Sequence, residues 1–232
     1  MRQAGGWGAA AGSSLLGLLL LVLAIPRLAS AFYLLPGEEA LQLVKQGSRP
    51  SDAGLLRAID AQAAALDIMP RGEVHMDTAY LAQALAESTS ADEERAELVG
   101  LARRHLGAAL ALAPGNPRGW MMLAGVRVSN GEEVAAARAL QVSFAADPHV
   151  LLLAPFRWPL AGLLGSRLTR EAREDASLEF LSFFRSFPEV AVRMALRRDR
   201  LSELSVLTYE RGSDRDRLAA ILARMRYQGA GT

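Results

Sequence analysis

The stretch PRGWMMLAGVRVSNGEEVAAARALQVSFAADPHV, residues 117–150, decides the fold class. Pro117 suits the first turn of a helix, because its φ angle is already helical and its missing N–H would have no partner there. Asn130-Gly131 is a turn signal, and Pro148 ends the segment. The segment therefore predicts two helices, residues 118–129 and 132–145, joined by a tight turn.

This segment resembles one tetratricopeptide repeat. Pro148 follows Pro114 by 34 residues, which is the period of that family. Arg127 departs from the pattern, since the family has Tyr or an aliphatic residue at this position. The positions where the segment has the family's large apolar or small residues are Trp120, Leu123, Ala124, Ala136, Leu140 and Ser143.

The resemblance implies that first-helix positions not packed against the second helix line a groove. Met adapts its shape and Arg reads carboxylates, so such a groove suits a peptide or helix of a protein partner. It also implies a likeness to membrane-anchored tetratricopeptide proteins of proteobacteria, some of which accompany the assembly of cell-envelope polysaccharide. The predicted partner-binding residues are Arg118, Met121, Gly125, Arg127, Val128 and Ser129.

Helical periodicity continues on both sides of this hairpin, so the prediction is an all-α fold. Residues 154–159 are the exception, because Pro155 and Pro159 favour a packed connector there. The predicted organisation is an N-terminal transmembrane anchor or signal peptide (1–35), a tetratricopeptide-like helical domain (36–150) and a C-terminal helical region (151–232).

The N-terminal segment is apolar, with an unbroken run at residues 15–25 and no charge between Arg2 and Arg27. As an anchor it would span residues 15–35, about 31 Å of helix and enough for a bilayer core of about 30 Å. As a signal peptide it would be cleaved after Ala31, which follows small residues. Arg27 opposes the anchor unless its side chain reaches the interface. The predicted anchor residues are Leu15, Leu20, Ile25, Phe32 and Tyr33.

Both interpretations carry the remaining chain across a membrane. Lys45 is the only lysine beside 25 arginines, a usage typical of GC-rich bacterial genomes. Arg2 on the short N-terminal side agrees with an N-inside topology. The prediction is a single-pass protein of the bacterial inner membrane with its body in the periplasm.

Composition and motifs argue against several classes of function. The formal net charge is +1, whereas nucleic-acid binders usually carry a marked basic excess. There is no cysteine, and His75, His105 and His149 lack a metal-binding spacing, so we expect no metal site and no cofactor. No catalytic motif is present, and the prediction is a protein that is not an enzyme.

The leading hypothesis is a membrane-tethered adaptor that binds a protein partner. Two alternatives stay open at this point. One is an exported envelope hydrolase, which would need an acidic side chain buried in a cleft, with other polar groups converging on it. The other is a structural subunit of a membrane complex, whose anchor would pack along other transmembrane helices.

Overall fold

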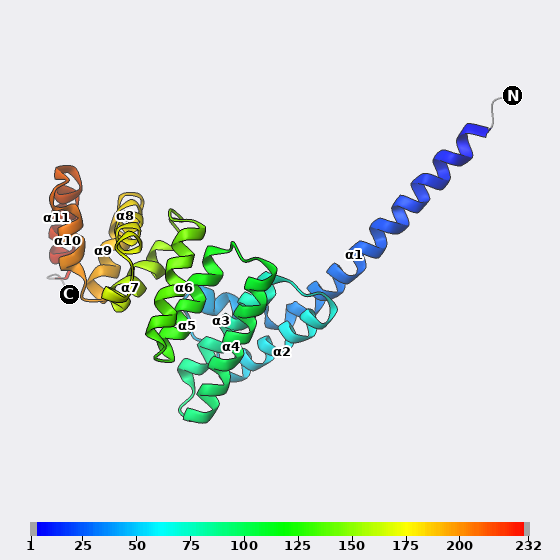
Figure 1. Cartoon of the computed structure of the whole chain (residues 1–232), viewed down its shortest axis with the longest axis horizontal. Helices are drawn as coiled ribbons and strands as arrows, with labels where there is room; N and C mark the ends of the chain where they lie inside the picture. The colour runs from blue at the N-terminus through cyan, green and yellow to red at the C-terminus, as the bar shows by residue number, and fades with distance from the viewer. Residues whose placement is uncertain (1–3, 230–232) are drawn as a thin grey trace. The chain divides into compact units, whose positions relative to one another are not determined.

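The computed structural model describes the backbone of residues 4–229 and the side chains of residues 17–225. Within this range the chain is helical and contains no strand, which confirms the predicted all-α class. The helices are α1 (Ala4–Lys45), α2 (Asp52–Ile68), α3 (Gly72–Ser88), α4 (Asp92–Leu112), α5 (Pro117–Ser129), α6 (Glu133–Ala146), α7 (Ala154–Leu164), a 3₁₀ turn (Gly165–Arg167), α8 (Arg170–Ser186), α9 (Pro188–Arg197), α10 (Leu201–Tyr209) and α11 (Gly212–Gly229) (Figure 1).

The chain divides into two compact units, residues 1–114 and 115–232. The first comprises α1–α4 and the second α5–α11. The predicted boundary between residues 150 and 151 lies inside the second unit, where α7 packs against both α6 and α8.

Helix α1 is the long element of the first unit, and its N-terminal part extends beyond α2–α4 (Figure 1). Its C-terminal part packs on α2 and α3 through a cluster that includes Leu41, Val44, Leu55 and Leu81. Gly37 lies so close to α2 that a Cβ atom there would be 2.7 Å from the Ala58 Cα. The two helices therefore need glycine at this crossing.

Helix α1 runs through both Pro26 and Pro36, so it continues without a break across the predicted boundary between residues 35 and 36. Each proline removes a helical hydrogen bond and strains the preceding turn. Ala40, Leu41 and Val44, which follow Pro36, are buried against α2 and α3, and this packing stabilises the continuous helix. No loop therefore separates the apolar segment from the first unit.

The second unit begins with the predicted hairpin. Asn116 caps α5, its Oδ1 accepting the Gly119 N–H at 3.1 Å, and Gly131 takes a left-handed φ of 75° in the turn. The core of the C-terminal helices is aromatic, with Trp158 of α7 stacked on Phe180 of α8 at 3.8 Å between ring centroids. Thr169 caps α8, its Oγ1 accepting the Ala172 N–H at 3.2 Å.

The connector expected at residues 154–159 is instead the start of α7. Pro155 falls in the first turn, where a missing N–H costs nothing, and Pro159 lies within the helix. The Leu153 carbonyl accepts the N–H groups of Phe156 and Arg157, both at 2.9 Å. Arg157 and Trp158 are buried, and their packing stabilises this helix despite Pro159.

Candidate functional site

The first candidate site is the apolar part of α1. By its length and composition, the helix of residues 17–45 is long and apolar enough to cross a membrane. The predicted anchor residues Leu20, Ile25, Phe32 and Tyr33 are all exposed. The side chain of Leu15 lies outside the described residues.

Ser30 shows where contact between α1 and the rest of the first unit begins. Its side chain is completely buried, and its Oγ accepts a hydrogen bond from Arg71 Nη2 at 3.4 Å. Arg71 is the residue that precedes α3. The packed body therefore starts at Ser30, six residues before the boundary expected at Pro36.

The second candidate site is the predicted groove on α5. Arg118 and Ser129 are exposed, and Gly125, Arg127 and Val128 are partly buried. Met121 is only 8% exposed and belongs to the core, so its assignment to an open groove is corrected. Its apolar side chain is more stable packed among neighbours than in water.

The Arg127 side chain is hydrogen-bonded within the α5–α6 hairpin. Its Nη1 donates a hydrogen bond at 2.9 Å to the carbonyl of Ala135 in α6. The guanidinium therefore joins α5 to α6, at the position where the resemblance to the tetratricopeptide family implies Tyr or an aliphatic residue, instead of turning into a groove. Leu123 and Ala124 are buried as expected, while Trp120 is only partly buried.

An arginine that the sequence analysis did not single out connects the hairpin to the helices that follow. Arg157 of α7 is completely buried. Its Nη2 donates to the Ser143 carbonyl at 2.7 Å, and its Nη1 donates to the Asp147 carbonyl at 2.8 Å. Ser143 Oγ in turn donates to the Pro117 carbonyl at 2.6 Å, so the network reaches the start of α5.

Glu179 of α8 is the ionic partner of this arginine. Arg157 Nη1 lies 2.8 Å from Glu179 Oε1, and Glu179 is 1% exposed. Burial raises the pKa of Glu179 to about 7 and outweighs the opposing effect of Arg157. Burial likewise lowers the pKa of Arg157. This pair could be found only from the fold, because its members are 22 residues apart.

The buried carboxylates of the described residues are Glu179 and Asp214. Glu179 pairs with Arg157, and Asp214 pairs with Arg185 at 2.7 Å. A general acid needs a cleft in which it can meet substrate. An arginine-paired carboxylate inside a helical core gives the hydrolase alternative no support.

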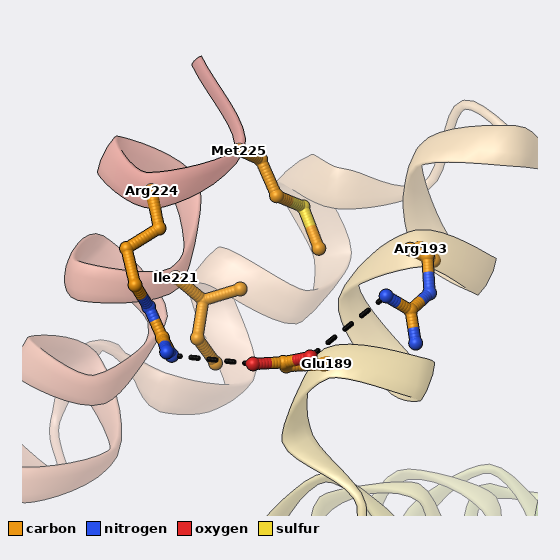
Figure 2. A pocket seen from close by; sticks show the side chains of 5 residues that line it. All are labelled: Glu189, Arg193, Ile221, Arg224 and Met225. Atoms are coloured by element: carbon orange, nitrogen blue, oxygen red, sulfur yellow. Dashed lines mark ion pairs between the residues drawn. The ribbon is translucent and has the colours of Figure 1, made fainter. Parts of the chain in front are cut away.

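A shallow pocket of about 180 Å³ lies between α9 and α11. Figure 2 shows Glu189 between two arginines, with Arg224 at 3.4 Å and Arg193 at 3.8 Å. The remaining lining residues are Ile221 and Met225. The pocket is smaller than the about 300–1,000 Å³ that is usual for ligand pockets, and both arginines pair with the same carboxylate, Glu189, so we base no proposal on it.

Two of the histidines meet in the first unit, which their sequence spacing did not indicate. His75 Nδ1 of α3 lies 2.9 Å from His105 Nδ1 of α4. Burial lowers the pKa of both, and for His105 the neighbouring His75 and Arg104 lower it further. In the described part of the chain no group of three or more His, Asp or Glu side chains could hold a metal ion.

No protein-family model matches the chain, and no curated protein matches it significantly. The tetratricopeptide resemblance therefore rests on the residues and on the helical hairpin that they form.

Proposed function

We propose that the protein is a membrane-tethered adaptor whose helical body binds a protein partner. The observation that carries the proposal is the exposure of the apolar residues of α1 on a helix that continues into the packed first unit. A soluble chain would leave this surface in water, at a cost of roughly 25 cal/mol for each Å² of apolar area. A bilayer removes that cost.

The partner surface that we propose runs along α5 from the exposed Arg118 to the exposed Ser129 and includes the partly buried Gly125 and Val128 between them. Met121 is withdrawn from this set because it is buried. The resemblance to anchored tetratricopeptide proteins supports a peptide or helix as the ligand. It also supports a body in the periplasm and a role beside cell-envelope polysaccharide assembly.

Affinity purification of the tagged full chain, at native expression and in mild detergent, tests the proposal. We expect a protein partner to co-purify, and Arg118→Glu to reduce its recovery. Arg138→Glu is the matched control, because it makes the same charge change at an exposed position of α6 in the same hairpin. Recovery of the chain alone contradicts the adaptor, and equal loss in both variants contradicts the assignment to α5.

Exchange of the apolar span separates an adaptor from a structural subunit. Residues 3–25 would be replaced by an unrelated transmembrane sequence of equal length, with the first unit left intact from Pro26 onward. An adaptor keeps its partner after this exchange, because its binding surface lies in the helical body. A subunit that packs along other transmembrane helices loses it.

A further inference from the structure

Between Pro26 and Pro36, helix α1 has two different faces. The inner face includes Ala29, Ser30 and Leu34, which are partly or fully covered. The outer face carries Leu28, Phe32 and Leu35, which are 61%, 71% and 65% exposed. Their spacing of four and three residues puts these three side chains on one side of the helix.

The inner face limits how deep this segment can lie in a membrane. Arg71 contacts Ser30, and Arg71 directly precedes the first turn of α3. A guanidinium and the unpaired N–H groups of a helix start are both costly in hydrocarbon. The hydrocarbon region must therefore end before Ser30 on the side that faces the body.

The sequence on the N-terminal side is long enough for this earlier exit. The charge-free residues 4–26 form about 35 Å of helix, more than the bilayer core of about 30 Å requires. Arg27 then marks the exit, where an arginine is favourable beside lipid phosphates instead of costly within the span. This placement removes the objection that Arg27 raises against a span of residues 15–35.

We propose that the outer face of α1, formed by Leu28, Phe32 and Leu35, lies in the lipid headgroup region while the inner face carries the first unit. This inference rests on the proposed membrane anchor. The occupant of the face is lipid, because the same helix surface continues without a break into the exposed apolar residues of the span, such as Leu21 and Ile25.

The lengths require α1 to tilt. An upright helix would carry Leu35 about 12 Å beyond Arg27, past a headgroup layer of about 5–8 Å. A tilt toward the outer face lowers Phe32 and Leu35 into that layer and raises the inner face. Transmembrane helices tilt by about 20° on average and by up to about 40°. The segment then acts as an interfacial helix with a folded unit on its polar side.

Depth-dependent fluorescence quenching tests this placement. The chain has no cysteine, so single cysteines at Leu20, Phe32 or Leu56 can each carry an NBD label in the full-length protein. All three side chains are exposed, and Leu56 on α2 is the aqueous control. The labelled proteins are placed in phosphatidylcholine–phosphatidylglycerol nanodiscs and quenched by iodide, or by lipids with a nitroxide near the headgroup or near the bilayer centre.

We expect the label at Phe32 to lose most emission with the headgroup-level nitroxide and little with iodide. A second label at Leu35 should behave in the same way. The inference is overturned if Phe32 is as accessible to iodide as Leu56, if the central nitroxide quenches it most, or if it is shielded from every quencher by protein. The label at Leu20 separates the proposed membrane anchor from the proposed placement of the outer face. If lipid nitroxides do not quench the label at Leu20, the proposed anchor is contradicted.

Discussion

Arg71 Nη2 donates a hydrogen bond to Ser30 Oγ across the first unit, so the residue before α3 is joined to the middle of α1. The Ser30 side chain is fully buried. Seven residues after Ser30, Gly37 crosses α2 at Ala58. The apolar helix is thus a part of the first unit and not a tether joined to it by a flexible loop.

The crossing of α1 and α2 predicts a specific effect of adding one methyl group. Gly37→Ala would bring a Cβ to 2.7 Å from the Ala58 Cα, so the helices must separate. We expect a loss of about 1–3 kcal/mol in the free energy of unfolding, as for other overpacked sites. Chemical denaturation of the detergent-solubilised protein measures it.

Gly107→Ala is the matched control, because Gly107 lies inside α4 and a Cβ atom added there would have no neighbouring atom within 4 Å. Alanine there should stabilise the protein by about 0.5–1 kcal/mol. Equal effects of the two substitutions would show that the α1–α2 crossing is not closely packed.

The buried pair of Arg157 and Glu179 predicts a large loss when one partner is removed. Arg157→Ala leaves the Glu179 carboxylate buried without its cation, and we expect a loss of about 3–5 kcal/mol. Arg170→Ala removes an exposed pair with Glu174, which water screens, and should lower the stability far less than Arg157→Ala does. Thermal unfolding followed by circular dichroism compares them.

Replacement of both partners tests whether the ion pair itself stabilises the fold. Arg157→Met with Glu179→Leu removes both charges and keeps the volume nearly constant. Buried ion pairs exchanged in this way often leave stability unchanged. We therefore expect the double variant to be more stable than Arg157→Ala; a double variant of lower stability would contradict this account of the pair.

The shifted pKa values predict two opposite dependences of stability on pH. The pKa of Glu179 is raised from 4.5 to about 7, so the folded chain holds a proton that the unfolded chain releases. Its contribution is fully present below about pH 4.5 and is lost as the pH rises through 7, a change of about 3 kcal/mol. Glu179→Gln should remove this loss at rising pH.

The stability that His75 and His105 contribute depends on pH in the opposite direction. Their pKa values are lowered from 6.5, so the stability they contribute is present above pH 6.5 and is lost as the pH falls below it. His105→Gln should make the protein less sensitive to acid than the wild type. Urea unfolding midpoints between pH 5 and 8 measure both effects; a variant whose pH profile matches the wild type contradicts the corresponding assignment.

The burial of Met121 predicts that it acts through packing. Met121→Ala should cost about 2–5 kcal/mol as a core truncation. Arg118→Glu, at an exposed position of the same helix, should change stability by less than about 0.5 kcal/mol. If Met121→Ala leaves the melting temperature unchanged and lowers partner recovery, Met121 belongs to the binding surface after all.

Local signals in the sequence predicted the parts of the fold that depend on local physics. Pro117 begins α5, and the Asn130-Gly131 turn separates α5 from α6. Each of these residues acts on backbone groups within a few positions of itself. Their effect can therefore be predicted without knowledge of tertiary contacts.

The sequence predictions that proved wrong concern places where tertiary packing opposes a local conformational preference. Pro36 and Pro159 favour breaks, but packing of the residues beside them keeps α1 and α7 helical. Met121 has the spacing of a groove residue and lies in the core. The burial of Arg157 depends on Glu179 and Ser143, and neither is near it in sequence.

The central claim is that α1 remains part of the mature protein and holds the helical body at a membrane. Intact-mass measurement of the protein extracted from membranes of its native host tests this most directly. The account predicts a membrane-bound chain that retains residues 4–31 and with them Ser30, the partner of Arg71. A soluble chain that begins at Phe32 would contradict it.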